Sequence, residues 1–181
     1  IEMRLFENIS LRDKHTFHID VKSRYWIDFE KTEELKNIFN NPGFSNLPYY
    51  IIGGGSNILF NNDFPGFLIH SCIKGIDVVC EDSDNVLVRV GSGINWDNFV
   101  YESLSRGWSG AENLSGIPGD VGATPVQNIG AYGVEAGDLI YSTEAYNIET
   151  GEVGCFKNSD CDFSYRNSVF KKELKGKYVI C

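Results

Sequence analysis

The sequence predicts a fold of mixed strands and helices, because short strand patterns outnumber helix patterns along the chain and glycine clusters separate them. Runs of alternating or β-branched residues recur through the 181 residues, whereas only two segments repeat apolar residues at helical spacing. The chain has no Gly-x-Gly-x-x-Gly that opens a long helix and no Gly-Lys-Ser/Thr. These absences argue against a nicotinamide-binding Rossmann domain and against a P-loop.

The first part of the chain predicts strands around one helix. Alternation in RYWIDF (24–29) predicts a strand whose apolar face carries Tyr25, Ile27 and Phe29. The next segment predicts a short helix that Thr32 caps and residues 42–43 end, with an apolar stripe of Leu35, Ile38 and Phe39. Residues 49–60 (YYIIGGGSNILF) predict a strand, a glycine turn and a second strand, and residues 66–72 predict another apolar strand.

The second part is richer in strands. Residues 76–80 and 85–93 predict two of them. A helix should follow, capped by Asn95 or Ser92 and ended by Gly107 at C′, with an apolar side formed by Trp96, Phe99, Val100 and Leu104. Residues 142–156 predict a hairpin that turns at 149–151, and residues 177–181 begin one more strand. Residues 116–133 (GIPGDVGATPVQNIGAYG) are poor material for a helix or a strand.

Composition indicates a soluble globular protein. Hydrophobic residues make up 42% of the chain, and no window approaches eighteen consecutive apolar residues. Arg4 and Glu7 interrupt the place where a signal peptide would need an apolar core. We therefore expect a cytoplasmic protein with no membrane segment.

The charge balance limits the class of partner. The formal net charge is −9 and no Lys/Arg-rich stripe offsets it, so neither nucleic acid nor an anionic membrane is an expected partner. A ligand phosphate would then be held by backbone N–H groups. The cysteines are odd in number and form no Cys-x-x-Cys pair, so we expect reduced thiols and no metal site: Cys72, Cys80, Cys155, Cys161 and Cys181.

The first glycine cluster, residues 53–57, directly follows a β-branched apolar run. Gly53, Gly54 and Gly55 can bring backbone N–H groups together around an anion, and Ser56 and Asn57 add side-chain donors. Such a turn could hold a pyrophosphate without any lysine. A tight hairpin is the alternative, since a glycine cluster alone is weak evidence.

The second cluster, residues 116–133, carries five glycines, two prolines and one charge. Its bare backbone could lie flat against a broad ring and offer peptide groups to the edge of that ring, with Gln127, Asn128 and Tyr132 as polar side chains of longer reach. The alternative is an irregular loop packed under the sheet. An irregular buried backbone leaves polar groups to satisfy, at about 1–3 kcal/mol for each one left unpaired, which favours a functional segment.

Together these segments carry a resemblance to a known family. IIGGGSNILF, GIPGDVGATPVQNIGAYGVE and CDFSYRNSVFK resemble, in order and spacing, three signatures of the UDP-N-acetylenolpyruvoylglucosamine reductases, the MurB family of peptidoglycan synthesis. HTFHID (15–20) resembles the family's Asn-Thr-Phe motif, with His15 in place of asparagine. The resemblance spans essentially the whole chain.

The resemblance implies an FAD-binding fold of the vanillyl-alcohol-oxidase type, like that of p-cresol methylhydroxylase, in two α+β subdomains at 1–73 and 74–181. It implies non-covalent FAD, with residues 53–57 around the pyrophosphate and the second cluster around the flavin. The implied cofactor-binding residues are Gly53, Gly54, Gly55, Ser56, Asn57, Ile117, Pro118, Gly119, Gly122, Ala123, Thr124, Gln127, Asn128, Gly130, Ala131, Tyr132 and Gly133.

The resemblance also implies the reaction. Family members take a hydride from NADPH and reduce the enolpyruvyl group of a UDP-sugar, giving UDP-N-acetylmuramate. Arg166 matches the catalytic arginine, whose planar fork can grip the substrate carboxylate, and Tyr165 would lie close to the substrate. Judged by spacing alone, an isolated arginine is more often part of a surface salt bridge. Asn167 departs from the usual aspartate beside the arginine.

The ends of the sequence suggest a piece of a longer protein. The chain begins with Ile1 and stops at Cys181 inside an apolar run. In the family, a C-terminal substrate-binding domain provides a serine that protonates C2 and a glutamate that assists it, and neither can be in these 181 residues. We therefore expect a monomer that binds FAD and is inactive, or nearly so, as a reductase.

Two rival interpretations stay open. One is an FAD-linked oxidase or dehydrogenase of the same cofactor fold, many of which attach flavin through a histidine in the glycine-rich loops. The histidines of this chain, His15, His18 and His70, lie outside both clusters. The other is a non-catalytic module that binds a nucleotide sugar or a partner protein without flavin, and uptake of added FAD would exclude it.

Overall fold

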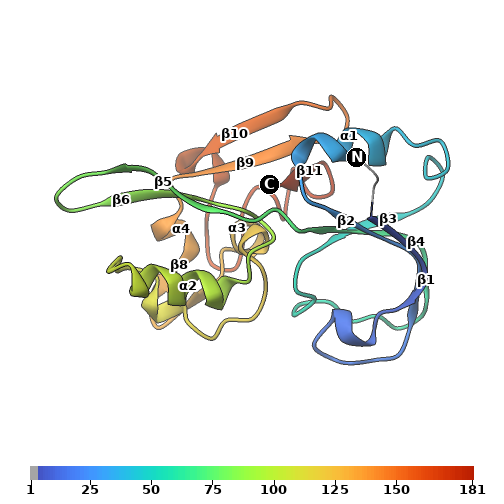
Figure 1. The fold of residues 1–181 in the computed structure, drawn as a ribbon, viewed down its shortest axis with the longest axis horizontal. Helices are drawn as coiled ribbons and strands as arrows, with labels where there is room; N and C mark the ends of the chain where they lie inside the picture. The colour runs from blue at the N-terminus through green and yellow to red at the C-terminus, as the bar shows by residue number, and fades with distance from the viewer. Residues whose placement is uncertain (1–3) are drawn as a thin grey trace.

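Four sheets organise residues 4–181, the part of the chain that the computed structural model of the protein describes (Figure 1). The largest has the strand order β1-β2-β4-β3, from Arg4–Ser10, Lys22–Phe29, Phe64–Ser71 and Tyr49–Ile52. Strand β1 runs antiparallel to β2, whereas β2 and β3 both run parallel to β4. The second sheet has the order β10-β9-β11, from Val153–Lys157, Ser142–Asn147 and Tyr178–Ile180.

Two-stranded pairs and short helices complete the architecture. The pairs are β5 with β6 (Ile76–Glu81 and Val86–Val90) and β7 with β8 (Gly130–Ala131 and Val134–Glu135). The α-helices are α1 (Thr32–Phe39), α2 (Trp96–Ser105), α3 (Thr124–Gln127) and α4 (Ala136–Leu139). The 3-10 helices are η1 (Arg12–Lys14), η2 (Glu112–Leu114), η3 (Val121–Ala123) and η4 (Asn158–Cys161).

The predicted first helix is confirmed, but its cap is not. Helix α1 begins at Thr32 itself, and Lys31 occupies the N-cap position with extended backbone angles and no side-chain cap. Thr32 therefore already has helical geometry and cannot serve as the cap. Leu35 and Ile38 are buried as the periodicity predicts.

The strand predicted after the first glycine cluster is wrong. Strand β3 ends at Ile52, and residues 58–60 form no strand. The side chains of Ser56 and Asn57 instead form hydrogen bonds with Pro118 and Gln127 of the second glycine cluster. Phe60 is buried with Trp26 and Leu68, so its apolar side chain packs in the core although the segment forms no strand.

Helix α2 follows its predicted start and end. The side chain of Asn95 accepts a hydrogen bond from the Asn98 N–H, and Gly107 has a φ of 79° just beyond the C-cap. Leu104 was expected on the buried side, yet it is 50% exposed, and Ser103 is buried in its place. Position 104 lies at the edge of the face that Trp96 and Val100 define, since successive helical residues rotate by about 100°.

The later strands match their predictions, and the second glycine cluster is more ordered than expected. Strands β9 and β10 pair around the turn at 149–151, and β11 pairs antiparallel with β9. Within 116–133 the chain forms η3 and then α3, where Pro125 lies in the first turn and Asn128 ends the helix with a φ of 46°. The expectation of neither helix nor strand there is wrong for these two helices and for β7, which begins at Gly130.

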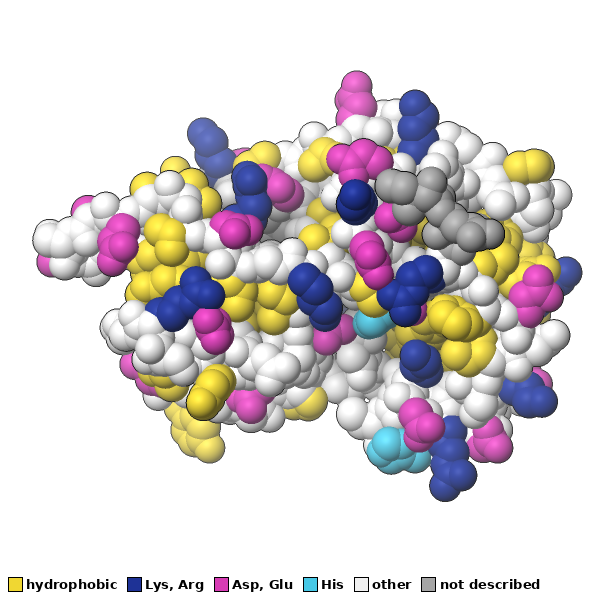
Figure 2. Space-filling view, viewed as in Figure 1, with side chains coloured by type: hydrophobic (Ala, Val, Ile, Leu, Met, Phe, Trp, Pro, Cys, Tyr) yellow, Lys and Arg dark blue, Asp and Glu magenta, His cyan; other side chains and the backbone are white. Residues whose placement is uncertain are grey.

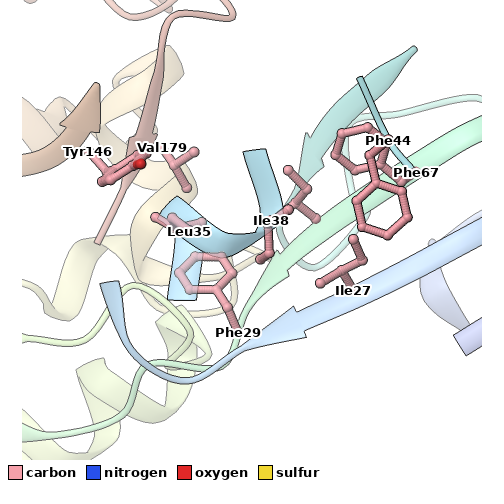
Figure 3. Close-up of a cluster of buried hydrophobic side chains, with 9 residues drawn as sticks. Ile27, Phe29, Leu35, Ile38, Phe44, Phe67, Tyr146 and Val179 are labelled. Carbon is pink, nitrogen blue, oxygen red and sulfur yellow. The ribbon is translucent and has the colours of Figure 1, made fainter. Parts of the chain in front are cut away.

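The main core joins the two larger sheets through α1. Figure 3 shows Leu35 between Val179 and Tyr146 on one side and Phe29 on the other. The predicted subdomain boundary at 73/74 lies in the link between β4 and β5, and the four-stranded sheet lies entirely before it. Because this core draws on both sides of the boundary, the division into subdomains stays a prediction.

Acidic and basic side chains are interspersed on the face drawn in Figure 2. Across residues 4–181, no helix is both long and apolar enough to span a bilayer. The five cysteines are free thiols, as predicted.

Candidate functional site

The two glycine clusters, far apart in the sequence, meet at the end of β3. The Ser56 hydroxyl donates to the Pro118 carbonyl at 3.1 Å, and the Asn57 amide donates to Gln127 Oε1 at 2.8 Å. These bonds join residues 62 and 70 positions apart. The fold therefore brings together the two segments that the sequence singled out.

Glycine is required where the two backbones approach each other. A Cβ atom on Gly54 would lie 3.1 Å from the Gly119 Cα, so a larger residue would press the loops apart. Gly55 has a φ of 66°, and a Cβ there would overlap the Lys14 carbonyl and lie 2.7 Å from the His15 Cα. The junction therefore presents main-chain groups, with no bulky side chain between them.

A cavity of about 410 Å³ opens at this junction, within the range of about 300–1,000 Å³ typical of ligand clefts. Most of the predicted cofactor-binding residues line it: Gly53, Gly54, Gly55, Ser56, Asn57, Pro118, Gly119, Gly122, Ala123, Thr124 and Gln127. Six predicted residues are not among its lining residues: Ile117, Asn128, Gly130, Ala131, Tyr132 and Gly133.

The cavity also includes residues that the sequence analysis did not select. Lys171 and Lys175 line it, together with the aromatic residues Tyr49, Trp96 and Tyr178. The Tyr49 hydroxyl donates to the Gly176 carbonyl at 2.9 Å, and burial raises the pKa of Tyr49. The lysine-rich run at 171–177 was the available signal for these two residues.

The side-chain amide of Asn128 forms its hydrogen bonds within the protein. It is fully buried, its amide donates to Glu135 at 2.7 Å and to the Ser164 carbonyl at 3.1 Å, and its oxygen accepts from the Gly137 N–H at 2.7 Å. The side chain therefore fixes the end of α3 against the segment that carries Arg166. Tyr132, in the turn between β7 and β8, is 89% exposed.

Arg166 and Tyr165 lie on a neighbouring turn and do not line the cavity. The Arg166 guanidinium donates to the Gly130 carbonyl at 2.8 Å, which ties it to the end of the second glycine cluster. Its φ of 54° is unusual for a residue with a side chain. Tyr165 is 82% exposed, and its ring centre lies 5.7 Å from the Arg166 guanidinium carbon. Both side chains are therefore accessible to a ligand that extends beyond the cavity.

A row of polar side chains runs from the sheet to the cavity wall. Trp26 donates to Asp28 at 2.8 Å, and His70 Nδ1 lies 3.0 Å from the same carboxylate oxygen. His70 Nε2 lies 3.5 Å from Asp120 Oδ2, and Asp120 lines the cavity. Neighbouring residues on parallel strands position this row, because Asp28 of β2 is paired in register with His70 of β4.

The pKa values of this row follow from burial and pairing. Burial lowers the pKa of His70, but hydrogen bonds to Asp120 and Asp28 outweigh it, so the net shift is upward from 6.5. Burial raises the pKa of Asp28, and hydrogen bonds from His70 and Trp26 turn the net shift downward. Both shifts favour an imidazolium that is paired with carboxylates.

Asp28, His70 and Cys72 form a group of residues with metal-ligand chemistry in the described chain. Their ligand atoms are all within 4.8 Å of one another. Asp28 Oδ1 already accepts from Trp26 and pairs with His70, and burial raises the pKa of the Cys72 thiol. Since these polar atoms are satisfied without an ion, we assign no metal to them.

Comparison with known proteins gives one matching domain family and many relatives. The family described as FAD binding domain matches residues 24–154. UDP-N-acetylenolpyruvoylglucosamine reductase from Amoebophilus asiaticus is 47% identical over 98% of this chain and 52% of its own length. The protein of the same name from Bacteroides fragilis is 46% identical over 96% of this chain and 52% of its own. The chain thus spans about half the length of these curated relatives.

Solved structures share the architecture. The UDP-N-acetylenolpyruvylglucosamine reductase (MurB) of Thermus caldophilus matches 99% of this chain and 60% of its own, with a TM-score of 0.76 at 24% identity. A p-cresol methylhydroxylase matches 93% of this chain and 36% of its own, with a TM-score of 0.56 at 13% identity. At these identities the likeness concerns the fold alone.

Proposed function

This chain belongs to the FAD binding domain family, among the MurB-type proteins, and from that premise we propose that it binds FAD non-covalently at the junction of its two glycine clusters. The predicted FAD-binding fold of the vanillyl-alcohol-oxidase type is confirmed. The observation that carries the proposal is the cavity lined by both clusters. We propose further that the chain serves an NADPH-dependent reduction of a UDP-sugar in peptidoglycan synthesis.

The residues present fit FAD in shape, and all of them except Asp120 fit it in charge. The backbones at Gly54 and Gly119 approach each other so closely that a Cβ atom on Gly54 would fill the space between them. Glycine keeps this space free, which suits a pyrophosphate held by backbone N–H groups. Lys171 and Lys175 add positive charge to the same cavity. Aromatic side chains at Tyr49 and Trp96 suit the flat rings of a dinucleotide.

Arg166 is the residue that we propose for the substrate side of the reaction. The chemistry that bound FAD would supply is hydride transfer from NADPH to the enolpyruvyl double bond of the sugar. Negative charge that develops beside the substrate carboxylate would be stabilised by the guanidinium, which the Gly130 carbonyl orients. Tyr165 contacts the guanidinium from the exposed side and would help to position it.

Uptake of FAD tests the proposal. The purified chain should bind added FAD with quenched flavin fluorescence, and Gly54→Val should weaken binding at least about tenfold, a loss of about 1.4 kcal/mol. The valine would press against Gly119. Gly43→Val is the matched control, because Gly43 is exposed and is not among the residues that line the cavity. Equal affinity in both variants, or no FAD uptake by the wild-type chain, would contradict the proposal. Yellow colour that stays with acid-precipitated protein would indicate covalent flavin instead.

The 181-residue chain should bind FAD without turning over. It spans about half of its relatives, and we propose that the other half carries the groups that protonate the substrate. A steady-state assay that follows NADPH oxidation with the enolpyruvyl UDP-sugar should therefore show no rate above the background without protein. A rate close to that of an intact relative measured in parallel would refute this expectation.

A further inference from the structure

His70 lies between two carboxylates, only one of which faces the proposed FAD site. Its Nδ1 is 3.0 Å from Asp28 and its Nε2 is 3.5 Å from Asp120. Asp120 is the one acidic side chain among the described residues that line the cavity. His70 itself is not a lining residue, so it can act on a ligand there only through Asp120.

The Asp120 carboxylate lies against the first glycine cluster. Its Oδ2 would be 3.5 Å from a Cβ on Gly53, and its Oδ1 would be 3.7 Å from one on Gly54. The backbone beside it is held in place, because Trp96 N–H donates to the Gly119 carbonyl at 2.9 Å and Val121 N–H to the Ile94 carbonyl at 2.8 Å. A negative charge is therefore fixed where the proposed pyrophosphate would bind, and an anion would be repelled unless a cation compensates it.

Only the doubly protonated imidazole can donate to both carboxylates at once. In the neutral form, the shorter contact to Asp28 would keep the remaining proton on Nδ1, and the Nε2 lone pair would face Asp120. The other charged or titratable groups acting on this row are Lys14, over the Trp26 ring at 4.6 Å, with Arg4, Cys72 and Lys74. Lys171 and Lys175 also line the cavity. None of these groups forms an ion pair with Asp120 in the described structure, which leaves His70 as its cationic partner.

We propose that His70 is a positioning residue for the dinucleotide diphosphate: as an imidazolium it neutralises the Asp120 carboxylate that lies against the first glycine cluster. This inference rests on the proposed function. The expected pH dependence has a definite sign. His70 is charged below its folded-state pKa, which lies above 6.5, so FAD binding should be strong there and weaken as the pH rises through that value.

FAD titrations of the folded chain at about pH 6 and about pH 9 test the inference. For the wild type we expect affinity to fall about fivefold to tenfold between the two, at the low end of typical coupling between sites. Asp120→Asn should bind tightly at both pH values. His70→Gln should bind at both as weakly as the wild type does at high pH. His18→Gln is the matched control, because His18 is exposed and its ring nitrogen Nδ1 lies 3.0 Å from the Arg12 carbonyl oxygen.

The double variant separates positioning from a merely structural role. If His70 acts through the charge of Asp120, adding Asp120→Asn to His70→Gln should restore tight, pH-independent binding. Continued weak binding by the double variant, or wild-type affinity in His70→Gln, would overturn the inference while FAD uptake itself stands. Failure of all variants and the wild type to bind FAD at any pH would overturn the proposed function as well.

Discussion

The Gly55→Ala variant is expected to lose about 3–5 kcal/mol of unfolding free energy, the sum of a strained backbone and a steric overlap. Gly55 has a φ of 66°, which L-residues adopt at a cost. The added methyl group would also overlap the Lys14 carbonyl and crowd His15, whose buried ring packs edge-on against Phe60 at 5.4 Å. Urea unfolding followed by tryptophan fluorescence measures the loss.

Gly107→Ala is the control for the backbone term alone. Gly107 has a φ of 79°, and a Cβ there would meet no atom within 4 Å. Its loss should be about 1 kcal/mol. If the two variants unfold at the same urea concentration, the close contact between residue 55 and residues 14–15 cannot be what makes glycine necessary at the first cluster.

The Leu35→Ala variant is expected to lose about 3 kcal/mol, within the range of 2–5 kcal/mol for a buried leucine. Leu35 is fully buried between the first sheet and the residues of β9 and β11 (Figure 3). Because Val179 packs in this core and also lines the cavity, loosening it should weaken FAD binding as well. Thermal unfolding with and without FAD measures both effects.

Leu104→Ala makes the same chemical change in helix α2. Leu104 is half exposed, and alanine is the better helix former, so the change in stability should stay within about 0.5 kcal/mol. Similar losses in the two variants would show that α1 does not join the sheets in the way that Figure 3 indicates.

Local patterns predicted most of the secondary structure. Alternation identified β2, and the Asn95 cap and Gly107 stop identified both ends of α2. The failures within this class are the Thr32 cap, the strand at 58–60, the burial of Leu104 and the lack of regular structure at 116–133. In each of them the local pattern was compatible with the prediction, and the tertiary structure decided the outcome.

The sequence by itself determined the chemistry available to this protein: two clusters that free the backbone, an acidic chain with few histidines, and an arginine within a family signature. Propensity, capping and glycine content act over a few residues and can therefore be read along the chain. The three segments that resemble the signatures of the family were sufficient to predict the fold.

Only the tertiary structure decided which of these residues meet. It placed Ser56 on Pro118 and Lys171 and Lys175 at the cavity, and it kept Arg166 on a separate turn. It also set His70 between Asp28 and Asp120, residues 92 positions apart by their numbers (120 less 28). Such contacts depend on the packing of whole sheets, because parallel pairing and core burial join segments whose separation in sequence carries no periodic signal.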